Sequence, residues 1–300
     1  MQLFKKTLTI NFMTISKRTS WLSLCLFICS FLFLIIYNLN LTIEFTGGTK
    51  FNFLVPNANI VEFRENAQNI LNQNIEVVEI ANDNLAKNFL VSTKFISDET
   101  DFINKLKNLY PDISLKSIDS FGPKLGLELQ QNARNAILLA LLLISIYISI
   151  RFDRYYALGS LAALVHDVII TLGILSLLNI EIGITVIAAL LTIVGYSLND
   201  TIVVYDRIRE NFYKLMNDSN INIINRSLNE TLNRTVITSI TTLLVVIILF
   251  FFGGAVLKPF AITLIIGILI GTYSSIFIAS PVMLYFEEKY PIPEFKEEEV

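Results

Sequence analysis

Ionisable side chains that follow or interrupt apolar runs are the residues of this sequence best suited to chemistry. The clearest is Asp200, which comes shortly after the almost wholly apolar run 182–194. An Asp at the centre of a membrane-spanning helix costs about 2.5–3.5 kcal/mol on insertion scales, and intramembrane carboxylates commonly mark proton relays. The plainer alternative is a hydrogen bond to a neighbouring helix, worth about 0.6 kcal/mol on average. Because an Asn would serve that purpose without an ionisation cost, the pattern favours a proton site.

A polar stripe further along the chain could act on this carboxyl. Arg234, Thr238 and Thr241 follow one another at helical spacing, so they lie on one face of a helix. A hairpin of two successive spans would bring that face to the depth of Asp200. Burial raises the pKa of a carboxyl and a nearby guanidinium lowers it, so movement of Arg234 would load and release a proton. The sequence thus predicts a proton pathway of Asp200, Arg234 and Thr238.

Other polar residues inside the predicted spans leave two roles open. His166 and Asp167 stand together in one span. Ser197 and Asn199 precede Asp200 in another. Each is either a relay residue or a packing residue, and a lone His is more often the latter. A protease dyad of His166 and Ser197 would lack an oxyanion-hole signature, and neither an HExxH motif nor Cys/His metal-ligand spacing is present. We therefore predict no enzyme, no metal and no cofactor, with protons as the coupling ion.

Bulk composition places these residues in an integral membrane protein. Of the 300 residues, 53% are hydrophobic and 16% are charged, against about 25% charged in a typical soluble domain. The mean hydropathy is +0.60, and several apolar runs reach the roughly 20 residues that a helix needs to cross a bilayer. The six predicted spans are 21–39, 132–150, 156–178, 182–204, 235–252 and 260–284. The first lacks an Ala-x-Ala site and is longer than a usual signal-peptide core, so we expect an uncleaved anchor.

Glycines mark the expected close contacts and bends. Within the spans, Gly195, Gly267 and Gly271 predict close approach of neighbouring helices, the last two as a GxxxG. Two stretches, FTGGT and SFGPKLGLEL, flank the long polar segment between the first two spans. They are either hinges or ordinary connections, since Gly allows tight or left-handed backbone and Pro stiffens a bend. The hinge candidates are Gly47, Gly48, Gly122, Pro123 and Gly126.

Basic residues predict the orientation of the chain. Lys and Arg collect before the first span, between the second and third, and between the fourth and fifth, whereas the opposite short loops carry almost none. By the positive-inside rule, the N-terminal residues 1–20 and the tail 285–300 are cytoplasmic, and the segment 40–131 faces outward. The segment 205–234 spaces apolar residues between polar ones, which predicts a cytoplasmic interfacial loop with amphipathic helix.

The outward segment has the sequence pattern of one small domain. Strand-like and helix-like stretches follow in the order βαββαβ, which is the ferredoxin-like arrangement. The segment contains no His, no Cys and no Gly-rich phosphate loop, and a fold alone implies no function, so we expect a protein-contact or spacer domain. The predicted fold is a polytopic α-helical membrane protein of six transmembrane helices, with a ferredoxin-like α+β domain between the first two.

Five motifs occur in order across nearly the whole chain: FTGGT, SFGPKLGLEL, ALVHDV, GYSLNDTIVVYDRIREN and LNRTVITSITTLL. In sequence and order they resemble the SecD/SecF family, and within it the SecF type, of the resistance-nodulation-division superfamily. One departure is Glu44, where the family commonly carries Asp; we expect no functional loss. The proton-path Asp, Arg and Thr of the family match Asp200, Arg234 and Thr238.

The resemblance implies a proton-driven half-transporter in the bacterial inner membrane, with its large domain periplasmic. Its implied partner is SecD, in a heterodimer that would use the proton-motive force in late steps of preprotein export through the SecYEG channel. YajC and YidC are further suggested partners, and no nucleic-acid partner is expected. The alternative is a half-subunit of a proton-coupled small-molecule or lipid exporter of the same superfamily. Single-chain exporters of that type usually carry twice as many spans and two outward domains.

Overall fold

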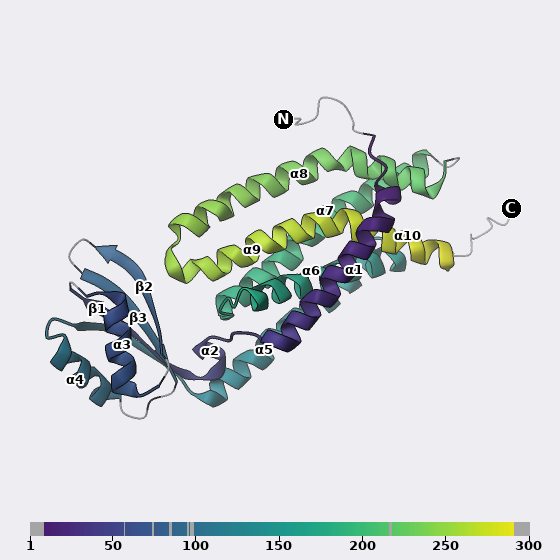
Figure 1. Ribbon diagram of the computed structural model, residues 1–300. Helices are drawn as coiled ribbons and strands as arrows, with labels where there is room; N and C mark the ends of the chain where they lie inside the picture. Colours follow the sequence, from purple (N-terminus) through teal and green to yellow (C-terminus); the bar gives the residue numbers. More distant parts are fainter. Residues whose placement is uncertain are drawn as a thin grey trace.

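A bundle of long helices carries a small sheet domain at one end in the computed structural model (Figure 1). The first helix begins and the last helix ends at the opposite end of the bundle. The structure describes residues 9–56, 58–73, 75–83, 86–94, 96, 99–215 and 218–290. Six helical segments among them are long and apolar enough to cross a membrane, which confirms the predicted polytopic membrane fold.

The membrane-spanning helices are longer than several of the predicted spans. The first five are α1 (Phe12–Tyr37), α5 (Pro123–Arg151), α6 (Arg154–Leu177), α7 (Ile184–Lys214) and α8 (Asn220–Phe252). The sixth is α9 (Gly254–Ser274), which continues through a π-helical turn, η1 (Ser275–Ala279), into α10 (Ser280–Lys289). Helices α1 and α5 begin well before the spans predicted at 21–39 and 132–150, because an apolar run marks the part suited to lipid and not the end of the helix.

The segment 205–234, which we predicted as an interfacial loop with amphipathic helix, belongs to two of the long helices. It is helical for most of its length, because α7 extends into it from one side and α8 begins within it. Several of its apolar residues, among them Ile208 and Leu228, are buried in the core of the bundle, whereas Tyr213 and Ile221 are exposed. That this segment lies at a membrane interface stays a prediction. Across the two helices, Arg207 Nε lies 2.6 Å from Glu230 Oε2. Helical periodicity predicts an apolar face but does not say what covers it.

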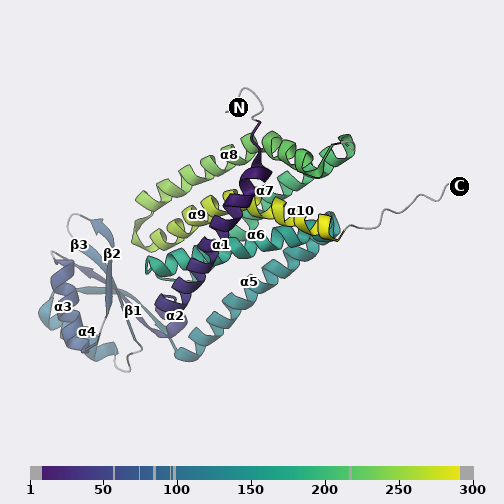
Figure 2. The same ribbon diagram turned by 45° about the vertical axis from the view of Figure 1, so that its right-hand side comes forward.

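The helices divide into a buried centre and an exposed periphery. Of the apolar part of α6, 61% is buried, against 11% for α1 and 6% for α5. The peripheral helices therefore present most of their surface to lipid or to a partner (Figure 2). At the centre, α7 and α9 approach closely at Gly267 and Gly271: a Cβ on Gly267 would lie 2.1 Å from Ile193 Cδ1. A Cβ on Gly271 would lie 3.0 Å from Ser197 Cβ.

The sheet domain has the predicted ferredoxin-like order. Its elements are β1 (Gly48–Val55), α3 (Ile60–Leu71), β2 (Glu76–Asp83), β3 (Ala86–Thr93), α4 (Glu99–Leu109) and β4 (Ser114–Phe121). The strands form one antiparallel sheet in the order β2-β3-β1-β4. Helices α3 and α4 lie on the same side of the sheet (Figures 1 and 2), and alternate residues of the strands, such as Phe51, Phe53 and Phe89, fill the core beneath them.

Two connections join the sheet domain to the bundle, and both are tightly packed. A short helix, α2 (Ile43–Thr46), precedes β1 and packs on α5. Gly47 has a φ of +81°, in the region that favours glycine. A Cβ on Gly126 of α5 would lie 2.5 Å from the Phe45 carbonyl oxygen, and one on Gly48 would lie 2.3 Å from the Thr93 carbonyl oxygen. These glycines therefore permit close packing of backbones.

The remaining hinge candidates lie where β4 turns into α5. Pro123 is in the first turn of α5, and Gly122 is its N-cap. A Cβ on Gly122 would meet nothing within 4 Å, so this position has room that the other candidates lack. That the domain swings about these residues stays a prediction.

Candidate proton site in the helix bundle

Asp200 lies on α7, on the side that faces the interior of the bundle. Its side chain is buried, with the residue 2% exposed. The atom Oδ2 is buried as well and has no hydrogen-bond partner among the residues that the structure describes. A buried polar atom without a partner is rare in a native protein and calls for an explanation. Here the atom is a carboxylate oxygen in a membrane-spanning helix, where an unpaired charge is most costly.

The predicted partners of Asp200 lie on the next helix, α8. The guanidinium of Arg234 and the hydroxyl of Thr238 both interact with the Asp200 carboxyl. The Thr238 hydroxyl also donates within its own helix, to the Arg234 carbonyl at 3.0 Å and to the Thr235 carbonyl at 2.9 Å. Arg234 is exposed, and it is not within salt-bridge distance of any carboxylate in the described part of the chain. The structure thus brings the three residues together without closing an ion pair.

One face of the α7–α8 pair is exposed although its residues are small or polar. On α7 the exposed positions recur along one side of the helix; they are Thr185, Ala188, Thr192, Gly195 and Asn199. On α8, Arg234 and Thr241 are exposed too. We predicted that Gly195 packs against a neighbouring helix, but a Cβ there would meet nothing within 4 Å. This correction has a physical reason: Gly195 lies on the side of α7 that no other described part of the chain covers.

A second polar cluster lies around Asp167 on α6, and the carboxyl at its centre is fully bonded, although His166 Nε2 has no partner among the described residues. Asp167 Oδ2 accepts hydrogen bonds from Ser197 Oγ at 2.7 Å and from Ser274 Oγ at 2.8 Å. Its other oxygen, Oδ1, lies 3.1 Å from His166 Nδ1. Asp167 is 1% exposed, and it joins side chains of three membrane-spanning segments, α6, α7 and α9. The cluster therefore links three helices, which is consistent with a packing role for His166, Asp167 and Ser197; a relay role for these residues stays a prediction.

The sequence did not assign Ser274 to this cluster. It stands among small residues, and its type and spacing indicated helix packing only. Its bond to Asp167 joins residues 107 positions apart, a distance over which no local pattern carries information. A Ser in an apolar span was the one available signal, because a hydroxyl buried in lipid or protein needs an acceptor.

The described residues hold no group of three or more His, Cys, Asp or Glu side chains placed to bind a metal ion. The candidate site is therefore defined by one open carboxyl, one guanidinium and one hydroxyl, contributed by Asp200, Arg234 and Thr238. Such a set can bind a proton, release it, and form or break an ion pair as it does so.

Comparison with known proteins gives consistent matches. The family model described as "Protein export membrane protein SecD/SecF, C-terminal" matches residues 101–289. A "Protein translocase subunit SecF" of Calditerrivibrio nitroreducens is 41% identical over 289 residues, which cover 93% of this chain and 95% of the relative. The protein of the same name from Haemophilus influenzae is 39% identical over 275 residues, covering 90% of this chain and 83% of the relative.

Solved structures extend the similarity to three dimensions. The crystal structure of SecDF, a translocon-associated membrane protein from Thermus thermophilus, superposes with a TM-score of 0.82 at 37% sequence identity. The match covers 96% of this chain but 40% of that longer chain. A second SecDF structure, in a super-membrane-facing form, has a TM-score of 0.74 at 36% identity, again covering 96% and 40% of the two chains.

Proposed function

The chain belongs to the SecD/SecF family of protein export membrane proteins, and we propose that it uses the proton-motive force to drive late steps of preprotein export. As a Sec translocase subunit of the SecF type, it would do this as the proton-carrying half of a complex. The sheet domain would move relative to the bundle and hinder backsliding of the emerging preprotein. The proposal assigns the chemistry to the bundle and the mechanical work to the sheet domain.

The observation that carries the proposal is the open carboxyl of Asp200. Its Oδ2 is buried without a partner in the described residues, and the Arg234 guanidinium interacts with it from α8 without forming a close ion pair. In an ionised Asp200 the carboxylate attracts the guanidinium, and a protonated one releases it. One charge that crosses 100 mV gains about 2.3 kcal/mol, which shifts a two-state equilibrium roughly fiftyfold.

The exposed face of α7 and α8 supports a partner subunit. Thr192, Gly195 and Asn199 are small or polar, and Arg234 carries a full charge, so this face suits another protein surface better than lipid. The T. thermophilus structure is titled SecDF, and the additional part of that longer chain indicates what such a partner is. We therefore propose SecD as the partner in a heterodimer that acts with the SecYEG channel on a translocating preprotein; YajC and YidC are further candidates.

The distribution of basic residues supports the proposed sidedness. The ends of α7 and α8 remote from the sheet domain carry Arg207, Arg209, Lys214 and Arg226. By the positive-inside rule, that end of the bundle is cytoplasmic in the bacterial inner membrane and the sheet domain is periplasmic.

The test is Asp200→Asn, assayed for preprotein export in membrane vesicles with and without an uncoupler. We expect export to fall to the level measured with the uncoupler, because Asn keeps the shape of Asp but binds no proton. The matched control is Asp206→Asn on the same helix, since the Asp206 side chain is 44% exposed and pairs with Arg151 at 3.4 Å. The Asp200→Asn variant should still co-purify with a SecD-type partner. Full gradient-dependent export by Asp200→Asn would overturn the assignment.

A further inference from the structure

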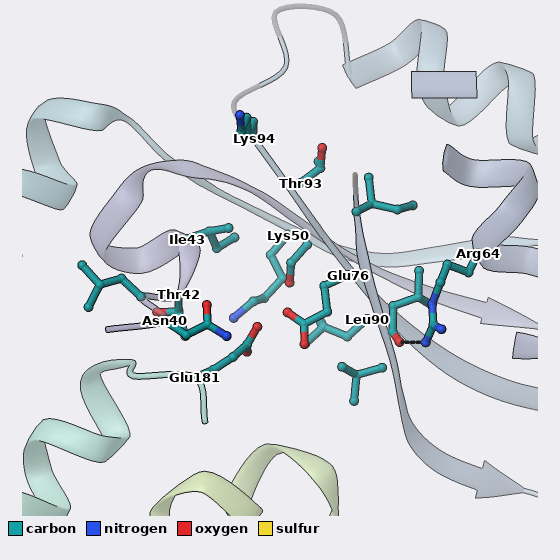
Figure 3. A pocket seen from close by; sticks show the side chains of 15 residues that line it. Asn40, Thr42, Ile43, Lys50, Arg64, Glu76, Leu90, Thr93, Lys94 and Glu181 are labelled. Carbon is teal, nitrogen blue, oxygen red and sulfur yellow. Dashed lines mark hydrogen bonds between the residues drawn. The ribbon is translucent and has the colours of Figure 1, made fainter. Parts of the chain in front are cut away.

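A half-open cavity separates the sheet domain from the bundle, and it is lined by both. Its volume is about 660 Å³. The sheet domain contributes residues of β1, β2 and β3, and the bundle contributes Glu181 from the loop between α6 and α7. Figure 3 shows the carboxyl groups of Glu76 and Glu181 pointing toward one another across this cavity. Glu76 belongs to β2 and is exposed, whereas Glu181 is half-buried.

The cavity holds more negative than positive charge near these two carboxyls. Lys50 of β1 extends toward them (Figure 3), but its Nζ is also 3.7 Å from Glu44 Oε1 of α2. Two further cations line the cavity at a greater distance. They are Arg64 of α3, which donates to the Val77 carbonyl at 3.0 Å, and Lys94 at the end of β3 (Figure 3). The Lys50 ammonium is therefore shared among three carboxyls, those of Glu44, Glu76 and Glu181.

This arrangement favours a proton on the pair. Burial, followed by the facing Glu76 carboxyl, raises the pKa of Glu181 to about 8, and Glu44 adds to the effect while Lys50 opposes it. A Glu in water has a pKa of about 4.3. Two carboxyls that face each other share a proton more readily than they both ionise. The proton is bound only while the sheet domain rests on the bundle, because separation returns both groups to water.

The strand that carries Glu76 is also the strand by which the sheet domain rests on the bundle. A Cβ added to Gly254, in the turn between α8 and α9, would lie 3.7 Å from the Ile80 carbonyl oxygen of β2. Strand β2 thus touches two of the loops at this end of the bundle. We propose that Glu76 and Glu181 form a proton-dependent latch, which holds the sheet domain against the bundle when the pair is protonated and releases it when both carboxyls ionise.

A separate contact at the same junction stays closed in either state. Glu44 Oε2 accepts the backbone N–H of Ile184 at 2.9 Å, so it caps the first turn of α7 from a position 140 residues away. Beside it, Leu41 and Ile182 form a parallel β-bridge, in which the Ile182 N–H donates to the Asn40 carbonyl at 2.7 Å. The backbone bonds of this bridge do not titrate, so the bridge between Leu41 and Ile182 is the fixed point about which the latch opens.

Docking weakens as the pH rises, because the docked state binds one proton more tightly than the undocked state does. The contribution of the latch to docking is complete below about pH 4.3 and is lost as the pH rises through the value of about 8. Between these limits the ratio of docked to undocked molecules falls as the pH rises, and above about 8 it levels off. Acidification of this face, as a proton gradient produces, therefore favours docking.

The test measures docking directly in the full-length chain. The two native cysteines, Cys25 and Cys29, are replaced by Ser, and spin labels are placed at Lys107→Cys on α4 and Val256→Cys on α9, both exposed positions. Distance distributions are recorded by pulsed electron resonance in nanodiscs from about pH 5 to about pH 9. We expect a second distance population that grows with pH and reaches a plateau above about pH 8.

Two variants separate the latch from a general effect of pH. Glu181→Gln should remove the pH dependence, because Gln stays neutral and can still donate to Glu76. Glu76→Gln changes an exposed position, so folding should tolerate it. In this variant the second distance population should reach its plateau at lower pH. The control is Glu62→Gln on α3, an exposed carboxyl of the same domain, and it should follow the wild type.

A wild-type distribution that does not change with pH would overturn the latch, as would a Glu181→Gln or Glu76→Gln variant that keeps the wild-type plateau. The measurement uses no preprotein, partner or gradient, so its outcome is independent of the export proposal.

Discussion

The bundle contains two buried aspartates on neighbouring helices, Asp167 on α6 and Asp200 on α7, and they differ in their partners. Asp167 accepts hydrogen bonds from two serine hydroxyls and lies beside a histidine nitrogen. Asp200 has a buried oxygen without a partner in the described chain. They are 1% and 2% exposed, so burial does not distinguish them. A fully bonded carboxylate stabilises one arrangement of its helices, whereas an open one is free to exchange protons and partners.

Their positions within the bundle match this difference. The partners of Asp167 come from α6, α7 and α9, which are the buried helices at the centre. The groups that act on Asp200 come from α8, whose apolar part is only 17% buried. The open carboxyl thus lies next to the exposed face of α7 and α8, where we propose that a partner subunit binds. The contrast suggests a criterion: the number of hydrogen bonds, and not depth alone, distinguishes the bonded carboxylate of Asp167 from the proposed proton-binding carboxylate of Asp200.

The largest effect after that of Asp200→Asn is expected from Arg234→Gln, which tests the open site. Removal of the guanidinium leaves an ionised Asp200 without the cation that stabilises it, so the step that releases the proton should slow. We expect the uncoupler-sensitive part of preprotein export to fall about tenfold, which is within the usual range of coupling free energies of 1–3 kcal/mol. Initial export rates in vesicles, measured with and without an uncoupler, check this.

The matched control for Arg234→Gln is Arg226→Gln on the same helix. Arg226 pairs with Glu230 at 3.1 Å, and Glu230 keeps a second cation in Arg207, so its loss should change the export rate little. Equal effects of the two substitutions would remove the special role of Arg234 and weaken the contrast between the two aspartates.

The next effect concerns Asp167, where Asn and Leu should behave differently. Asn can still accept from both serines and can donate to His166 Nδ1. The free energy of unfolding of Asp167→Asn should therefore lie within about 1 kcal/mol of the wild-type value, and the variant should keep gradient-dependent export. Asp167→Leu removes the acceptor from two buried hydroxyls and should cost about 1–3 kcal/mol in the free energy of unfolding. Unfolding in detergent measures both. An Asp167→Asn variant that loses export as Asp200→Asn does would break the comparison.

Much of the architecture could be predicted because it depends on local patterns. The lengths of the apolar runs predict the spans. The succession of strand-like and helix-like stretches predicts the βαββαβ order, which the sheet confirms. The spacing of Arg234 and Thr238 predicts a shared helix face, since it depends only on helical geometry. Asp200 was found because a carboxylate in an apolar span is conspicuous by itself.

The remainder depends on contacts between distant segments. The segment 205–234 has an apolar face that suits either a membrane surface or another helix, and the chain beyond the segment decides which. Gly195 is exposed for the same reason, because its type permits close packing but does not supply a neighbour. Glu76 and Glu181 lie on segments far apart in the sequence and face each other only in the folded chain, so neither is unusual in its own stretch of sequence.

The smallest effect is expected from single removal of the serines that bond Asp167, and it measures how firmly the closed site is held. Ser197→Ala and Ser274→Ala each remove one donor while the other still bonds Oδ2, so each should cost about 0.6–1.5 kcal/mol in the free energy of unfolding. In the Asp167→Leu background Ser197 has lost this acceptor and Ser274 keeps only the Gly271 carbonyl at 3.1 Å, so further substitution should cost little. A double-mutant cycle by unfolding in detergent gives this coupling. Full additivity would mean that the serines do not bond Asp167, and the closed site would then be as open as the one at Asp200.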